Sequence, residues 1–355
     1  MVLLRRDAAP APAQLHRRSA WSRTAAALAV LALAAGCQGK ASTGASGTTA
    51  AGASAGPSGA AFPGVPTGPA ATTVGHPTRG PLTVASAGYT ESDVMAALYS
   101  ALLTKGGYAV KITAIPITDT LETSLEKGLV DLVAQPAAAY TNQLNALIRG
   151  AGAAPVASGD VTATMAQLSP LAVARGLTPL HPTAAVDEYA FAVSKAYATL
   201  HNLTTLSDLG RLGTPVRLAA GDDCATAAWC QPGLLRTYGI KVSVLDPLGM
   251  DTVVAKNAVL NKKDQLAAVV TTDGMLVTSK LVILTDDKHL QAAGNLVPIV
   301  NTKALAAHPD IATDLNKLVA VLSTGDVARM IAAVDTARQR PADVAAAYLR
   351  SKSLL

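Results

Sequence analysis

Charged and aromatic side chains are scarce in this sequence. Of its 355 residues, 15% are charged and 3% are aromatic, whereas half are apolar. A chain with this much apolar surface can bury one large core or two ordinary cores, so we expect a folded protein. The 29 basic and 24 acidic residues give a net charge of +5. Several arginines precede the first apolar run, so the remainder is near neutral and no nucleic-acid partner is expected.

Sequence patterns for catalysis and for metal binding are lacking as well. The six histidines are scattered, and none has the spacing of a metal site or a catalytic triad. No paired carboxylates or phosphate loop supports an enzyme. The segment around Ser54 matches G-x-S-x-G, but it lies in a tract that predicts neither the strand nor the helix of a nucleophile elbow. We therefore expect no catalysis, no cofactor and no bound metal.

The first 36 residues are typical of an export signal. Basic residues precede an apolar run at 24–36, which is shorter than the roughly 20 residues of a membrane-spanning helix. The run ends in "LALAAGC", which resembles a bacterial lipobox and implies that Cys37 is lipidated. We expect a chain anchored by this lipid to the outer face of the cell membrane. The alternative is an ordinary secretory signal cleaved nearby.

Residues 37–80 contain almost no charged or large apolar side chains. Alanine, glycine, serine, threonine and proline dominate this segment. Such a composition cannot bury enough surface to fold. We expect a disordered tether that carries the following domain away from the membrane.

Cysteine is rare, and two of the three cysteines lie close together in "GDDCATAAWCQPG". In an oxidising compartment, such a pair in a loop bounded by glycine and proline favours a disulfide over a metal site. We expect a bond between Cys224 and Cys230 that fixes the local shape of the loop.

After residue 80, short β-rich runs alternate with helical patterns. A strand at 82–87 precedes a helix with one apolar face, and Thr90 and Asp93 have the spacing of a capping box at its start. The pattern continues as β-α-β-α-β, which predicts a parallel sheet. A second α/β series follows, and the chain ends in helices. The boundaries we expect are 81–185 for the first lobe, 186–300 for the second, and 301–355 for helices that return to the first.

The order of these motifs resembles a known family. The segments "GYTES", "DEYAFAVSK", "PGLLRTYGI" and "LTDDKHLQAAGNLVPIV" are similar to those of the glycine betaine, choline and carnitine binding proteins of osmoprotectant ABC importers. The resemblance implies an α/β fold of the periplasmic-binding-protein type (type II), with a ligand cleft between two lobes. It also implies a lipoprotein that binds a small solute and delivers it to a permease in the membrane.

The resemblance further implies how the solute is held, and where this chain departs from its relatives. Quaternary ammonium ligands have no proton to donate and are held by aromatic rings through cation-π contacts. Pro136 stands where relatives commonly have a cage tyrosine, and Ala227 where they often have an arginine. Gly294 replaces a position that is often aromatic. These departures weaken the prediction of a betaine ligand but leave the predicted fold unchanged.

The candidate ligand-binding residues come from the turns and strands expected at the cleft. Each has a plainer alternative, such as a core aromatic, a helix cap, a turn or a surface position. The candidates are Tyr89, Thr90, Tyr140, Tyr189, Trp229, Thr271, Thr272 and Asp273.

We expect a monomer that captures a small osmoprotectant-like solute and catalyses nothing. One alternative is the same fold diverged to an uncharged or amino-acid-like solute. Another is a sensor or structural lipoprotein without a transport role.

Overall fold

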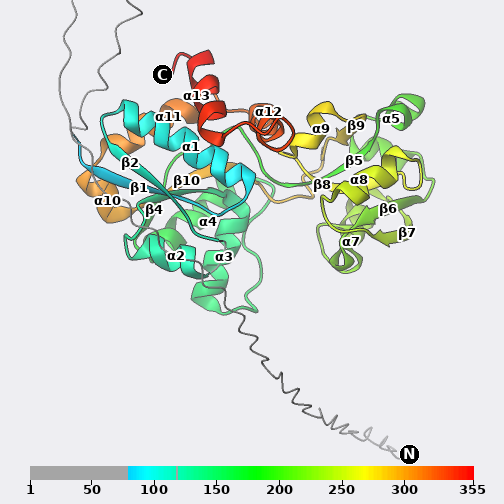
Figure 1. Cartoon of the computed structure of the whole chain (residues 1–355). Helices are drawn as coiled ribbons and strands as arrows, with labels where there is room; N and C mark the ends of the chain where they lie inside the picture. The colour runs from blue at the N-terminus through cyan, green and yellow to red at the C-terminus, as the bar shows by residue number, and fades with distance from the viewer. Residues whose placement is uncertain (1–78, 117–118) are drawn as a thin grey trace, which may run out of the picture. The chain divides into compact units, whose positions relative to one another are not determined.

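The computed structural model describes residues 79–116 and 119–355 of the protein. These residues form two β-sheets of five strands each, and helices pack on both (Figure 1). Each sheet has its own hydrophobic core, so the predicted α/β architecture of two lobes is confirmed. The predicted export signal, tether and lipidated Cys37 lie outside the described residues.

The sheet of the first lobe has the strand order β2-β1-β3-β10-β4. Its parallel part, β1 with β2 and β3, matches the predicted β-α-β-α-β unit. The strands are β1 (Pro81–Ser86), β2 (Ala109–Ala114), β3 (Leu132–Pro136), β4 (Leu177–Pro179) and β10 (Leu296–Asn301).

Strand β10 corrects the expected end of the second lobe at residue 300. It runs antiparallel to β3, with Leu296 opposite Pro136 and Val300 opposite Leu132. The chain therefore returns to the first lobe at Leu296. An apolar strand signals burial but not which sheet it joins, so the sequence pattern alone misplaced it.

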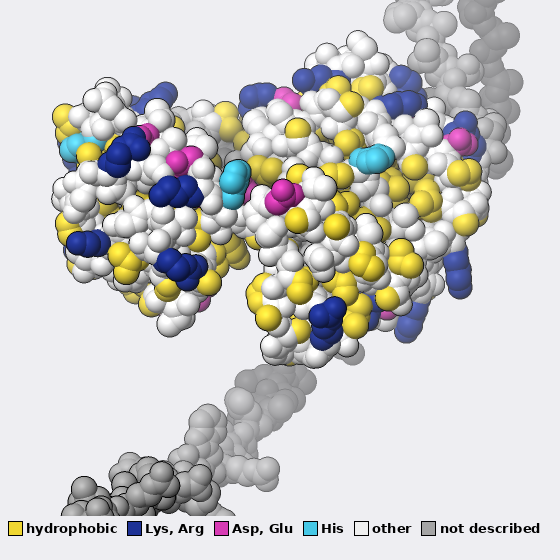
Figure 2. Space-filling model, turned by 180° about the vertical axis from the view of Figure 1, so that it is seen from behind, with side chains coloured by type: hydrophobic (Ala, Val, Ile, Leu, Met, Phe, Trp, Pro, Cys, Tyr) yellow, Lys and Arg dark blue, Asp and Glu magenta, His cyan; other side chains and the backbone are white. Residues whose placement is uncertain are grey.

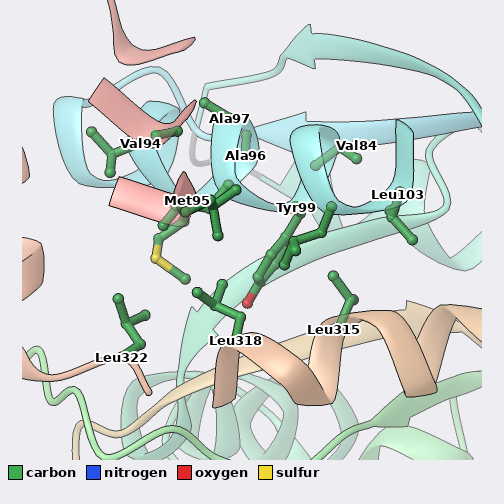
Figure 3. Packing of buried hydrophobic residues seen from close by; sticks show 14 of the residues in the cluster. Val84, Val94, Met95, Ala96, Ala97, Tyr99, Leu103, Leu315, Leu318 and Leu322 are labelled. Atoms are coloured by element: carbon green, nitrogen blue, oxygen red, sulfur yellow. The ribbon is translucent and has the colours of Figure 1, made fainter. Parts of the chain in front are cut away.

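Helix α1 lies at the centre of the first core. Its apolar face packs against α11, and Figure 3 shows Met95 and Tyr99 of α1 close to Leu318 of α11. The helices of this lobe are α1 (Thr90–Lys105), α2 (Asp119–Glu126), α3 (Ala137–Arg149), α4 (Val161–Val173), α10 (Thr302–Ala307), α11 (Asp310–Val319), α12 (Thr324–Asp335) and α13 (Pro341–Ser351).

The start of α1 differs from the predicted capping box. Tyr89 occupies the cap position, and no side chain caps the helix. The Thr90 hydroxyl donates to Asp335 of α12 at 2.7 Å, and the Ser86 hydroxyl donates to Asp93. Both members of the predicted box thus bind partners outside the helix, which local spacing cannot reveal.

The sheet of the second lobe has the order β7-β6-β8-β5-β9. Its strands are β5 (Tyr189–Ser194), β6 (Val216–Ala220), β7 (Val242–Pro247), β8 (Leu266–Val270) and β9 (Leu281–Leu284). Its helices are α5 (Lys195–His201), α6 (Leu206–Arg211), the 3-10 turn η1 (Asp222–Ala225), α7 (Gln231–Gly233), the π-helical turn η2 (Leu234–Tyr238), α8 (Val253–Leu260) and α9 (Gly274–Thr278).

Two segments connect the lobes, at residues 180–188 and 285–295, and they pair with each other. Val186 and Asn295 form an antiparallel bridge, and the Asp187 amide donates to the Gly294 carbonyl at 2.8 Å. A Cβ atom at position 294 would lie 1.9 Å from the carbonyl oxygen of Asp187. Only glycine allows the connecting segments to approach this closely, which explains why the chain lacks an aromatic residue there.

Figure 2 shows one face of the protein, on which Lys and Arg side chains are scattered among apolar ones. On the described part of that face they form no continuous basic band. No helix within 79–116 or 119–355 combines the length and hydropathy needed to span a bilayer.

Candidate functional site

Three aromatic side chains form a stack at the start of β5. The rings of Tyr189 and Trp229 lie 4.2 Å apart between centroids and 28° from parallel. Phe191 lies behind them, with its ring 6.2 Å from Trp229. Alternate residues of a strand share a face, so Tyr189 and Phe191 both meet the indole. Phe191 is fully buried but Tyr189 is 44% exposed, so the stack opens to solvent at the tyrosine.

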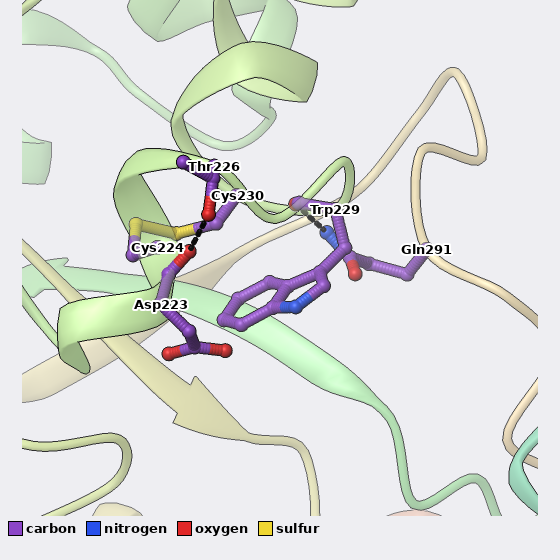
Figure 4. Close-up of a disulfide and its surroundings, with 6 residues drawn as sticks. All are labelled: Asp223, Cys224, Thr226, Trp229, Cys230 and Gln291. Carbon is purple, nitrogen blue, oxygen red and sulfur yellow. Dashed lines mark hydrogen bonds between the residues drawn. A yellow bond between two sulfur atoms is a disulfide. The ribbon is translucent and has the colours of Figure 1, made fainter. Parts of the chain in front are cut away.

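The disulfide loop holds Trp229 in this position. Cys224 and Cys230 are bonded, as predicted, and both are fully buried. The Gln291 side chain comes from the connecting segment and donates to the Trp229 carbonyl at 3.0 Å (Figure 4). The indole is thus fixed by a covalent ring on one side and by the lobe connection on the other.

A buried acid, Glu91, and a half-buried acid, Asp187, meet at a single hydroxyl close to the start of β5. Glu91 comes from the first turn of α1, Asp187 from the connecting segment, and Thr272 follows β8, so all three parts of the fold contribute. The Thr272 hydroxyl lies 3.4 Å from Asp187 and also hydrogen-bonds Glu91. We call Glu91, Asp187 and Thr272 the acidic junction.

Burial and mutual repulsion favour the protonated forms of these acids. Burial, and then the charge of Asp187, raise the pKa of Glu91 to about 8, against the effect of the Thr272 hydroxyl. Burial also raises the pKa of Asp187. A hydroxyl has one hydrogen to donate, so Thr272 can donate to one carboxylate and accept the proton of the other. The arrangement therefore favours one protonated and one ionised acid.

Tyr89 places a phenol ring beside the acidic junction. Burial, and then the charges of Glu91 and Asp187, raise the pKa of its hydroxyl. The side chain is still 37% exposed. Tyr89 and Thr272 therefore gather around the junction, whereas the neighbouring candidate Thr90 is bound to Asp335 and serves the packing of α1 on α12.

A third acid, Glu188, follows Asp187. It accepts a hydrogen bond from the Gly294 amide at 3.3 Å. Burial raises its pKa, and the nearby His289 partly opposes this shift. Glu188 thus adds negative charge between the acidic junction and Tyr189.

The candidates Thr271 and Asp273 have partners within the protein. The Thr271 hydroxyl donates to the Val186 carbonyl at 2.6 Å and fixes the connecting segment. Asp273 caps α9 and lies 2.7 Å from the ammonium of Lys256. The charge of Asp273 is therefore compensated, unlike that of the acidic junction.

Tyr140 lies in the core of the first lobe and not beside the aromatic stack. It is 1% exposed, and its hydroxyl donates to both carboxylate oxygens of Glu122 at 2.9–3.0 Å. Burial raises the pKa of Glu122 to about 7. Pro136 ends β3, and Ala227 packs against the second core.

Sequence reasoning missed the acids Glu91, Asp187 and Glu188. The acidic pair directly before the candidate Tyr189 was a usable signal, because charges next to an aromatic strand residue are uncommon in a core. Glu91 gave no such signal, since acids are common in the first turn of any helix.

Comparison with known proteins adds the family. A family model described as the substrate binding domain of ABC-type glycine betaine transport system matches residues 80–351. A glycine-betaine-binding protein of Pseudomonas aeruginosa is 27% identical over 276 residues, which cover 75% of this chain and 86% of the relative.

Two solved structures share the fold. Apo YehZ from Escherichia coli matches with a TM-score of 0.68 and 23% identity, covering 78% of this chain and 99% of that one. A structure described as a glycine betaine/carnitine/choline ABC transporter matches with a TM-score of 0.69 and 21% identity, over 78% and 99% of the two chains.

Proposed function

The chain belongs to the family of substrate-binding domains of ABC-type glycine betaine transport systems, and we propose that it captures a quaternary ammonium solute at the aromatic stack and acidic junction. The observation that carries this proposal is the pairing of an open Tyr189–Trp229 stack with buried acids. Aromatic faces and negative charge attract the same kind of guest.

Cation-π attraction suits a guest that has no hydrogen-bond donor on its charged group. Each contact between a ring face and a desolvated cation contributes about 0.5 to 2 kcal/mol. Tyr189 and Tyr89 both keep more than a third of their surface exposed. Each therefore has ring surface available to a guest.

The position of the acidic junction supports a mechanism of lobe closure. Its members come from α1, the connecting segment and the end of β8, so a guest bound there touches both lobes. The paired connecting segments, bridged at Val186 and Asn295, would absorb the change in backbone dihedrals. The protein acts by binding and release, and it needs no catalytic step.

Substrate-binding proteins of ABC importers work outside the cytoplasm, and we place this chain there. Its buried disulfide fits an oxidising compartment. We propose that Cys37 carries the lipid anchor, that residues 37–80 act as the tether, and that a membrane permease receives the solute from a monomeric chain.

Isothermal titration of the full chain with glycine betaine, choline, carnitine and ectoine tests the proposal. We expect micromolar binding of at least one quaternary ammonium compound. Heat release from none of them would contradict it.

The vacated positions Pro136 and Ala227 favour a second candidate, in which the site has diverged to an uncharged or amino-acid-like solute. Native mass spectrometry of the protein purified from its own host distinguishes the two. A co-purified quaternary ammonium supports the first candidate, and any other small solute supports the second.

A further inference from the structure

The acidic junction is short of positive charge. Among the ion pairs of residues 79–116 and 119–355, none includes Glu91, Asp187 or Glu188. Yet Glu91 is only 6% exposed and Thr272 only 2%. Buried carboxylates without a paired cation are costly, so the site is built to accept either a proton or a cation.

Several charged and titratable groups surround the acidic junction. The charge of Asp187 raises the pKa of Glu91, and the charges of Glu91 and Asp187 raise the pKa of the Tyr89 hydroxyl. On α1 itself Asp93 is bound to Ser86, and on α12 Asp335 is bound to Thr90. The remaining neighbours are Glu188 with His289 on the connecting segments, and Lys256, which is held by Asp251 and Asp273 ahead of α9.

We propose that Glu91 and Asp187 set the specificity of the site: it takes a quaternary ammonium solute of net positive charge, without a carboxylate, and it releases a proton as that solute binds. This inference rests on the proposed function and narrows it. A solute cation takes the place of the shared proton between the two acids. A zwitterion brings a carboxylate toward these acids, for which the described residues show no paired cation.

Cation binding and proton release are coupled in a definite direction. In the free protein the pKa of Glu91 is about 8, because of burial and the charge of Asp187. A bound cation stabilises the ionised carboxylate and lowers this pKa. Binding therefore expels a proton below about pH 8, and the affinity for the cation rises by up to about tenfold per pH unit until pH 8 and is constant above it.

The test is calorimetric titration of the full chain with choline and with glycine betaine from pH 6 to pH 9, each in two buffers of different ionisation enthalpy. We expect choline to bind at least tenfold more tightly than glycine betaine at pH 8. We also expect close to one proton to be released per choline at pH 7. Equal affinities, or no proton release, overturn the inference while the proposed function stands. Silence with both ligands overturns the inference, and silence with carnitine and ectoine as well overturns the proposed function.

Two variants test which carboxyl group releases the proton when choline binds. Glu91→Gln keeps the size of the side chain and much of its hydrogen bonding. We expect this variant to release no proton on binding. We also expect its affinity for choline to fall at least tenfold at pH 8, with no loss of affinity for glycine betaine. Glu122→Gln is the matched control, because Glu122 is equally buried and its pKa is also raised, but it lies against Tyr140 in the first core. Loss of proton release in the control instead of in Glu91→Gln contradicts the assignment. If Glu91→Gln does not fold, the proton count of the unaltered chain decides.

Discussion

Two consecutive residues after β8 belong to two different clusters of charged side chains, and only one of these clusters contains a cation. Thr272 belongs to the acidic junction, whose acids Glu91 and Asp187 have no paired cation. The next residue, Asp273, belongs to an ion-paired cluster with Lys256 and Asp251. Burial of charged side chains therefore does not by itself indicate a binding site. The cluster that contains its own cation is internally compensated, and we propose that the cluster that lacks one receives the solute.

The largest expected effect comes from removing the cation of the ion-paired cluster. Lys256→Met keeps an unbranched chain of similar length but leaves the partly buried Asp251 and Asp273 without a counter-charge. We expect the free energy of unfolding to fall by about 3–5 kcal/mol, measured by urea denaturation. The control is Lys280→Met at an exposed position, where a change within about 0.5 kcal/mol is expected. Equal losses of unfolding free energy at the two positions would show that the ion-paired cluster does not stabilise the fold.

Glu91→Gln is expected to change stability in the opposite direction. The folded state binds the Glu91 proton more tightly than the unfolded state, because its pKa rises from 4.5 to about 8. The free energy of unfolding of the unaltered protein therefore falls, relative to the variant, as the pH rises from 4.5 to 8, and the gap is constant above 8. We expect a gap on the order of 2–4 kcal/mol at pH 8.5 in favour of the variant. If the free energies of unfolding of the two proteins instead change in parallel between pH 4.5 and 8, the pKa of Glu91 is not raised in the folded state.

Tyr189→Ala tests whether the aromatic stack contacts the ligand. It removes the exposed ring of the stack but leaves Phe191 and the disulfide loop in place. We expect ligand affinity to fall at least tenfold, about 1.4 kcal/mol, by calorimetry, with a small change in melting temperature. Tyr189→Phe keeps the ring and serves as the control, with affinity within a few-fold. An alanine variant that binds as tightly as the phenylalanine variant would exclude the ring from the site.

The smallest effect is expected from Tyr140→Phe, which removes one hydroxyl from the first core. The loss of the hydrogen bonds to Glu122 should lower the free energy of unfolding by about 1 kcal/mol. Ligand affinity should not change, because Tyr140 is buried away from the aromatic stack. A variant with normal stability and weakened binding would instead return Tyr140 to the site.

The sequence predicted those features that depend on neighbouring residues. The parallel β1-β2-β3 unit, the apolar face of α1 and the Cys224–Cys230 bond all follow from local spacing and composition. Tyr189 and Trp229 were separate candidates, and their stacking across 40 residues appears only in the structure.

The features that sequence patterns missed depend on contacts between distant segments. Strand β10 joins β3 across most of the chain, so its apolar pattern did not reveal its sheet. Thr90 and Asp93 fit a capping box but found tertiary partners. Glu91 was not among the sequence candidates, because only the fold shows that it is buried next to Asp187.

The central claim is that a cationic guest sits against the Tyr189–Trp229 stack, and the fluorescence of Trp229 tests it most directly. The chain has two tryptophans, so Trp21→Phe leaves Trp229 as the sole reporter. We expect choline to change the Trp229 emission in a saturable manner, with the same midpoint as calorimetry, and we expect Tyr189→Ala to abolish the change. Calorimetric binding with an unchanged Trp229 emission would place the guest elsewhere and contradict the account.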